Sequence, residues 1–114
     1  MNIHELISSA KLLQPRKAEI DGLGVVFFRR RTLVEQVEQD KAIAKHREAK
    51  KAGNDAEAAS TLLAIVLADL CDESGTPQCA TPEEAEAVAS KLSASVSIDL
   101  IDAWNGAIQA DAKN

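Results

Sequence analysis

The residue types that most often carry out chemistry are few and widely spaced in this chain. Its two cysteines, Cys71 and Cys79, have seven residues between them and no histidine nearby. Zinc sites use closely spaced cysteine and histidine pairs, so this spacing argues against a metal site. Two cysteines also make no disulfide framework, and we expect one buried thiol and one thiol beside a turn. His4 and His46 are isolated in the sequence, and we interpret both as ordinary surface histidines.

Acidic residues are grouped near the cysteines without the spacing of a calcium or catalytic site. The pairs Asp72-Glu73 and Glu83-Glu84 lack the alternating acidic positions of a calcium-binding loop, so helix capping explains them better. The sequence also has no glycine-rich phosphate loop and no recognisable pairing of a nucleophile with a base. We therefore expect no catalytic residue, no cofactor and no metal, and we predict that the protein is not an enzyme.

Three consecutive arginines, Arg29-Arg30-Arg31, are the most concentrated charge in the chain. One interpretation is phosphate binding. Another is a solvated strand end whose charges protect a sheet edge, and a third is contact with a protein partner. The chain has a net charge of −5 and only 3% aromatic residues, whereas base-stacking surfaces need aromatic faces. We therefore favour the second and third interpretations and expect no nucleic-acid partner.

The composition favours a single helical domain. The 114 residues are 46% apolar and 27% charged, and they include twenty alanines but only three aromatic residues. Alanine favours helices, whereas aromatic and β-branched residues favour strands, and the length is typical of one domain. The longest apolar run, residues 62–68, is too short to cross a bilayer, and the N-terminus lacks the features of a signal peptide. We expect a protein of the reducing cytoplasm with no membrane partner.

Charge is divided unevenly along the chain. Residues 1–52 have a net charge of +4, and residues 53–114 have a net charge of −9. Opposite charges on two parts of one molecule favour contacts between copies. Contacts between unlike surfaces of identical chains build open spirals when they do not close into rings. We therefore expect the protein to bind itself, as a homo-oligomer or an open spiral.

The N-terminal part is predicted to form a short helix and a β-hairpin. Apolar residues recur at helical spacing over residues 2–13, and Pro15 ends that helix. Residues 16–31 first alternate between charged and apolar side chains and then become β-branched and aromatic, with a turn at Asp21–Gly24. Because two strands alone are marginally stable, the hairpin must pack on a helix or pair with another chain.

Four longer helices are predicted after the hairpin. Thr32 and Glu35 form a capping box at the start of the first, and Thr81-Pro82 starts the third. The second is apolar on nearly all sides, which predicts a central buried helix. The fold class is mainly α with a small N-terminal β-hairpin (α+β), a single domain over residues 1–114 with four to five helices around central helix 56–71. The four helices are predicted over residues 32–52, 55–71, 82–92 and 95–110.

The order of these motifs resembles a known family. The predicted hairpin ends in Phe27-Phe28-Arg29-Arg30-Arg31 and is followed at once by Thr32-Leu33-Val34-Glu35. An apolar helix runs into Cys71-Asp72-Glu73-Ser74-Gly75-Thr76-Pro77 and then into the acidic helix start Thr81-Pro82-Glu83-Glu84-Ala85. The last predicted helix contains Trp104-Asn105-Gly106. Over most of the chain this pattern resembles the tail assembly chaperones of long-tailed bacteriophages, in their short, non-frameshifted form.

The resemblance implies a non-enzymatic protein of the infected host's cytoplasm. Proteins of this family coat the long, aggregation-prone tape measure protein until tail tube subunits polymerise around it, and they are usually absent from the finished virion. The family commonly makes a longer product by ribosomal frameshifting, and the extra domain of that product is expected to recruit the tail tube protein. The C-terminal Ala112-Lys113-Asn114 is compatible with the slippery heptamer A-AAA-AAC.

Two surfaces are predicted to bind partners in such a coating protein. The first is the apolar face of the N-terminal helix, and the second is the last strand of the hairpin, a candidate for β-addition to a neighbour or client. The alternative is that both simply pack on the central helix. The predicted partner-binding residues are Ile3, Leu6, Ile7, Phe27, Phe28, Arg29, Arg30 and Arg31.

Two other functions fit the same sequence. A structural virion protein of the tail or of head completion has the same expected fold, and its presence in purified virions distinguishes it from a chaperone. A small regulator that binds nucleic acid through Arg29–Arg31 and Lys41–Lys51 predicts salt-sensitive binding. The acidic C-terminal half and the scarcity of aromatic residues argue against the regulator.

Overall fold

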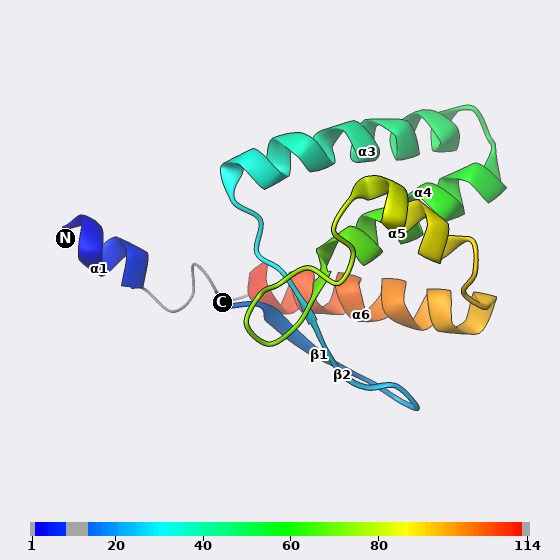
Figure 1. Cartoon of the computed structure of the whole chain (residues 1–114). Helices are drawn as coiled ribbons and strands as arrows, with labels where there is room; N and C mark the ends of the chain where they lie inside the picture. Colours follow the sequence, from blue (N-terminus) through cyan, green and yellow to red (C-terminus); the bar gives the residue numbers. More distant parts are fainter. Residues whose placement is uncertain (1, 9–13, 113–114) are drawn as a thin grey trace.

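Helices account for most of the chain in the computed structural model, which describes residues 2–8 and 14–112 (Figure 1). A small antiparallel sheet accompanies them, so the predicted class, mainly α with a small N-terminal β-hairpin, is confirmed. In chain order the elements are α1 (Ile3–Ser8), β1 (Arg16–Ile20), β2 (Gly24–Phe28), α3 (Leu33–Lys51), α4 (Asp55–Asp69), β3 (Leu70–Cys71), α5 (Pro82–Ala89) and α6 (Ala94–Ala112).

Strands β1 and β2 form the predicted hairpin. They pair antiparallel, with Arg16 opposite Phe28 and Ile20 opposite Gly24. Gly22 and Gly24 have φ angles of 85° and 90°, a region that other residues rarely adopt, and this backbone allows the tight turn between the strands. The hairpin is shorter than predicted, because β2 ends at Phe28 and the three arginines form the link to α3.

A third strand, β3, was not expected from the sequence. Helix α4 ends at Asp69 rather than at residue 71, and the next two residues become extended and pair antiparallel with β2. Phe27 lies opposite Cys71, and Phe28 lies opposite Leu70. The pairing satisfies backbone groups of β2 that a two-stranded hairpin leaves open. The end of the central helix is thereby joined to the sheet.

Side-chain caps start two helices where the sequence predicts them. The Thr32 hydroxyl accepts from the Glu35 amide, and the Glu35 carboxylate accepts from the Thr32 amide, which makes the capping box of α3. The Thr81 hydroxyl accepts from the Glu84 amide at the start of α5, whose first residue is Pro82. These bonds satisfy amides that the first turn of a helix leaves without partners.

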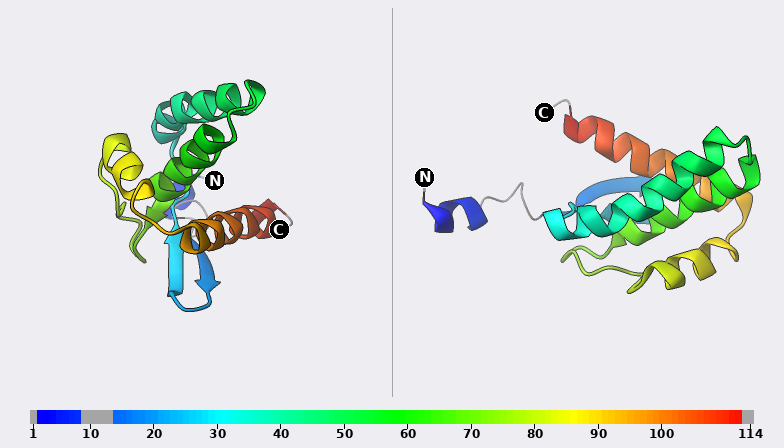
Figure 2. Two further views of the ribbon diagram at one scale, coloured as in Figure 1. Left: turned by 90° about the vertical axis from the view of Figure 1, so that its right-hand side faces the viewer. Right: turned by 90° about the horizontal axis from the view of Figure 1, so that it is seen from above.

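Helix α4 is the centre of the core, as predicted. Its Leu63, Val66 and Leu67 are buried, and the sheet contributes Phe28, of which only 1% is exposed. Leu100 of α6 belongs to the same cluster. Figures 1 and 2 show α3, α5 and α6 around α4, with the hairpin alongside α6. Burial of these apolar side chains is the main favourable contribution to folding.

Helix α1 lies away from the other elements in Figure 1 and in the right-hand view of Figure 2. It contains six residues, and its Ile3 is 66% exposed. The helices that surround α4 are therefore α3, α5 and α6. In the described part of the chain, the N-terminal helix α1 does not pack on the central helix α4.

Some predicted boundaries move. The N-terminal helix, predicted over residues 2–13, ends at Ser8, and residues 9–13 lie outside the part of the chain that the structure describes. Helix α5 ends three residues early, at Ala89, and α6 ends two residues late, at Ala112. Among the described residues, no helix is long and apolar enough to cross a membrane.

Candidate functional site

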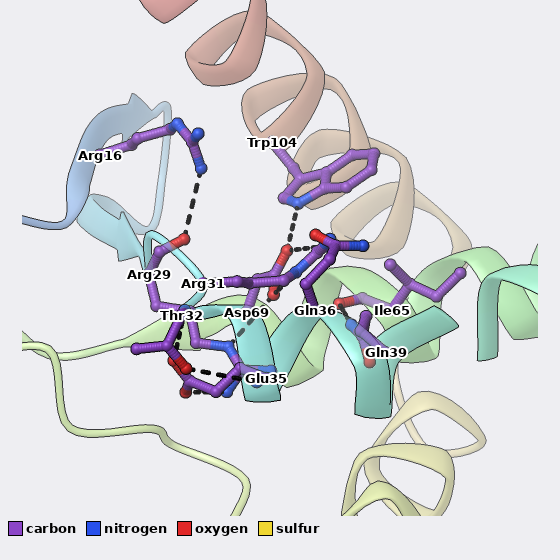
Figure 3. A network of polar contacts seen from close by, with 10 residues as sticks. All are labelled: Arg16, Arg29, Arg31, Thr32, Glu35, Gln36, Gln39, Ile65, Asp69 and Trp104. Carbon is purple, nitrogen blue, oxygen red and sulfur yellow. Dashed lines mark hydrogen bonds and ion pairs between the residues drawn. The ribbon is translucent and has the colours of Figure 1, made fainter. Parts of the chain in front are cut away.

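A buried carboxylate at the end of α4 joins three parts of the chain (Figure 3). The side chain of Asp69 is 3% exposed. Its Oδ1 accepts from Nε of Arg31 at 2.8 Å and from Nε of Arg29 at 3.2 Å. Its Oδ2 accepts from Nε1 of Trp104 at 2.9 Å and also from Arg31, whose ion pair is therefore two-pronged. These donors replace the water that a buried carboxylate loses.

Arg29 extends this cluster to the start of α3. Its Nη1 lies 2.6 Å from Oε2 of Glu35, the carboxylate that also closes the capping box. The hydrogen bond from the Thr32 amide lowers the pKa of Glu35, and the charge of Arg29 lowers it further. The amide of Arg29 also donates to the Asp69 carbonyl at 2.7 Å. The link between β2 and α3 is thus held against the end of α4 by side chains and backbone together.

A second carboxylate, Asp111 of α6, binds Arg30 and Arg16. It forms ion pairs with Arg30 and with Nε of Arg16, the latter at 3.2 Å. The hydrogen bond from Arg30 lowers the pKa of Asp111 to about 2, and the same bond raises the pKa of Arg30. Arg30 also donates through Nε to the carbonyl of Gln14 at 2.8 Å. The C-terminal end of α6 is thereby tied to the chain on both sides of the hairpin.

The arginine run is therefore not a solvated strand end, and that interpretation is corrected. The side chains of Arg29 and Arg31 bind Asp69, whereas that of Arg30 binds Asp111. Side chains alternate between the two sides of a strand, and the three arginines continue this alternation directly after β2. The position of the run after a predicted strand is therefore a signal that the sequence contains. The partner carboxylates lie 38 positions from Arg31 and 81 positions from Arg30, so only the fold selects them.

A groove of about 570 Å³ lies over α4, between α3 and α6. Its apolar walls come from all three helices, and its arginines come from β1 and from the link before α3. A volume of this size is typical of a ligand-binding cleft. The two ion-pair clusters border the groove, because Arg16, Arg30, Arg31 and Asp69 all line it. The apolar lining residues are Ile43, Leu62, Ile65, Trp104 and Ile108.

Polar contacts hold α3 against α4 beside the groove. The buried Gln39 donates through Nε2 to the carbonyl of Ile65 at 3.0 Å. Nδ1 of His46 lies 2.8 Å from the carbonyl oxygen of Ala58 and 3.1 Å from Oγ1 of Thr61. His46 is a half-buried contact between two helices, which corrects its interpretation as an isolated surface histidine.

The groove was not predicted from the sequence. Its lining residues are spread over residues 16–108 and meet only in the folded chain. Ile43 is the single large apolar residue in a stretch of α3 that otherwise contains alanine, charged and polar residues. A single apolar residue of this kind is common on protein surfaces and does not by itself indicate a binding surface.

The predicted partner-binding residues lie in different places. Phe28 is buried in the core, so its side chain contacts the chain itself, and its place among the contact residues is corrected. Phe27 is half-buried and paired with β3, and Ile3 is exposed on α1. The side chains of Leu6 and Ile7 lie outside the part that the structure describes.

Both cysteines are buried, Cys71 in β3 and Cys79 in the loop before α5. Burial raises the pKa of Cys71 to about 11 and also raises the pKa of Cys79. Both groups therefore stay protonated at neutral pH, a form that reacts weakly. Within residues 2–8 and 14–112, no group of His, Cys, Asp or Glu side chains is arranged to hold a metal ion.

The acidic residues near the cysteines stabilise local structure. Oδ1 of Asp72 accepts from the amides of Ser74 and Thr76 and so closes the turn after β3. The hydrogen bond from the Ser74 hydroxyl, together with these amides, lowers the pKa of Asp72. Glu84 accepts from the Ala80 amide at the start of α5. The predicted capping role is confirmed for Glu84, whereas Asp72 closes a turn.

The arrangement suits binding of an apolar group. Apolar walls favour an apolar occupant. The charged residues at the groove's border are paired with one another, so they do not require a charged occupant.

Protein-family models, curated proteins and solved structures were each compared with this chain, and none matches it.

Proposed function

We propose that this protein is a tail assembly chaperone of a long-tailed bacteriophage. It is a non-enzymatic protein that binds the tape measure protein in the host cytoplasm and keeps it soluble until tail tube subunits assemble around it. The groove over α4 is the observation that carries the proposal. The motif order from the hairpin to the last helix, which resembles that family, supports the same function.

The groove suits an apolar segment of a long client. Ile43 of α3, Leu62 of α4 and Ile108 of α6 line it, so a segment that lies along α4 contacts three helices at once. Burial of apolar surface contributes roughly 25 cal/mol per Å², and Trp104 supplies an aromatic side chain of the kind that dominates binding interfaces. An apolar segment that aggregates when free is the partner that such a surface selects.

The ion-pair clusters hold the groove in shape before a client binds. Arg31 and Trp104 line the groove, and both are bound to Asp69. The two other arginines at its border are bound to Asp111. Side chains that are already fixed lose little conformational freedom on binding, which favours affinity.

The same contacts favour a protein client over nucleic acid. Binding to phosphate is driven by arginines and lysines that neutralise the backbone charge, whereas Arg29, Arg30 and Arg31 pair with carboxylates of the chain itself. The alternative of a structural virion component differs in one outcome. That component is present in purified particles, from which the chaperone is absent.

A longer, frameshifted product that recruits the tail tube protein belongs to the same proposal. Its test is the codon for Lys113 in the gene, within the tripeptide Ala112-Lys113-Asn114. An AAA codon inside the heptamer A-AAA-AAC supports slippage at that point, and an AAG codon counts against it.

The first experiment is co-expression with the tape measure protein encoded downstream in the same genome. We expect soluble client in a stoichiometric complex with this chain, and insoluble client in its absence. A client that stays insoluble and unbound when both are expressed contradicts the proposal.

A matched pair of variants tests the groove. Ile108→Gln changes a lining residue, and Ile98→Gln makes the same change on the exposed first turns of α6. We expect Ile108→Gln to weaken client binding roughly tenfold, which is about 1.4 kcal/mol, and Ile98→Gln to leave it unchanged. An equal loss in both variants removes the groove from the proposal.

A further inference from the structure

Helix α1 combines apolar residues at helical spacing with a position away from the rest of the molecule. Ile3, Leu6 and Ile7 recur at the i, i+3, i+4 spacing of one helix face, and Ile3 is largely exposed. Isolated helices shorter than about 12–15 residues are marginal in water, and α1 has six residues. Its stability therefore requires a surface to pack on.

The groove over α4 is a surface of matching character. The chain enters β1 at Arg16, which lines the groove, so the segment that carries α1 is attached at the groove's border. In Figure 1 and in the right-hand view of Figure 2, α1 lies beyond the end of the body at which α3 begins and α6 ends. Among the described residues, none of those that line the groove belongs to α1.

The charges of the two surfaces also match. The arginines that line the groove are paired with Asp69 and Asp111, so the groove does not require an acidic occupant. Residues 2–13 contain one acidic residue, Glu5, and one basic residue, Lys11. A nearly neutral apolar helix enters such a groove without separating ion pairs or burying an unpaired charge.

We propose that α1 of one copy docks in the groove over α4 of a second copy. The two contacting surfaces differ, so the interface is heterologous, and its repetition builds an open chain or a ring of copies. The inference concerns the purified chain alone and does not rest on the proposed function. Where both hold, the client and the neighbour's α1 compete for one groove, and client binding disassembles the chain of copies.

Two full-length variants separate the two sides of this contact. The α1 variant carries Leu6→Asp and Ile7→Asp and keeps the groove intact, whereas the groove variant carries Ile43→Gln and Ile108→Gln and keeps α1 intact. In sedimentation velocity, we expect the mass of the wild-type protein to rise with concentration and each variant alone to be monomeric. When mixed, the two variants form a 1:1 dimer and nothing larger, because only one intact contact remains between them.

The single tryptophan reports the same contact directly. Trp104 lines the groove, and a peptide of residues 1–13 contains no tryptophan. When this peptide is added to the α1 variant, we expect a saturable shift of the Trp104 emission to shorter wavelength. The groove variant is expected to bind the peptide about tenfold more weakly. A peptide with both α1 substitutions is the matched control and leaves the emission unchanged.

Three results overturn this inference. The wild-type chain stays monomeric at every concentration, the mixed variants fail to combine, or the wild-type peptide leaves the Trp104 emission unchanged. The first result is the one expected if α1 folds back onto its own molecule, because the wild-type groove is then already occupied. Circular dichroism establishes that each variant is folded, and Ile108→Gln alone replaces the double substitution if that variant loses helix. Loss of client binding with self-association intact refutes only the proposed function.

Discussion

Asp69 and Asp111 bind arginines of the same three-residue run, yet their surroundings differ. The side chain of Asp69 is 3% exposed, and that of Asp111 is 30% exposed. Asp69 accepts from two arginines and from Trp104, whereas Asp111 pairs with Arg16 and Arg30 near the end of α6. When its hydrogen-bonding partners are removed, a buried carboxylate has no water to take their place. A partly exposed carboxylate can be hydrated instead.

The comparison shows that one charged run has two structural roles. The cluster around Asp69 joins the end of α4, the link before α3 and the middle of α6, so it holds the fold together. The cluster around Asp111 fastens the last turn of α6 to the start of β1 and to the residue after Arg29, so it shapes one border of the groove. Variants of the two carboxylates should therefore have unequal effects.

The largest effect is expected for Asp69→Asn. The substitution keeps the shape of the side chain but removes its charge, which leaves Arg29 and Arg31 as half-buried cations without this counter-charge. We expect the free energy of unfolding to fall by about 3–5 kcal/mol, measured by urea denaturation followed by circular dichroism. Asp102→Asn, on the exposed side of α6, is the matched control. A loss no greater than that of the control would contradict the central role of Asp69.

An intermediate effect is expected for Trp104→Phe. Phenylalanine keeps an aromatic ring but cannot donate to Oδ2 of Asp69, while both arginine partners of that carboxylate remain. A hydrogen bond to a charged group contributes about 1.5–3 kcal/mol, and we expect unfolding measured by circular dichroism to show a loss in this range. A loss larger than that of Asp69→Asn would mean that packing of the indole ring outweighs the ion pairs.

The smallest effect is expected for Asp111→Asn. Its ion pairs are partly exposed, so added salt should reduce the difference between the variant and the wild type further. Equal sensitivity of the Asp69 and Asp111 variants to salt would remove the distinction between the two clusters. The free energy of unfolding of each variant is measured by urea denaturation at low and at high ionic strength.

The pH dependence of the Asp111 contribution has a defined sign. The pKa of Asp111 is lowered to about 2 in the folded protein, whereas an aspartate in an unfolded chain has a pKa of roughly 3.9. The stabilisation is therefore fully present above the unfolded value and is lost as the pH falls through the folded one. The difference in unfolding free energy between wild type and Asp111→Asn should be constant near neutral pH and should shrink below about pH 4. A difference that does not change with pH would show that these ion pairs contribute nothing.

Local signals in the sequence are sufficient to predict the capped helix starts and the hairpin turn, because these features form between residues that are close in the chain. Thr32 and Glu35 lie three residues apart and cap each other, and Thr81 caps the Glu84 amide at the same spacing. Gly22 and Gly24 permit the hairpin turn for a similarly local reason. Each of these features depends on atoms that are neighbours in the chain, so reading the sequence locates them.

Features that depend on which elements meet were harder to predict. Strand β3 exists because the edge of β2 is available to Leu70 and Cys71 after α4 ends, and that edge lies more than forty positions away in the sequence. Phe27 and Phe28 are both apolar, so their alternation alone does not say which one faces the core. Packing of the sheet on α4 buries Phe28 and leaves Phe27 half-buried.

The sequence by itself determined the helical class, the hairpin, the helix caps and the burial of α4, because periodicity and capping are properties of short segments. Only the tertiary structure decided that Arg29 and Arg31 bind Asp69, that Arg30 binds Asp111, and that α3 and α6 leave a groove over α4. The physical reason is distance along the chain: several carboxylates and apolar faces have the right chemistry, and the packing of the helices selects which of them come within contact.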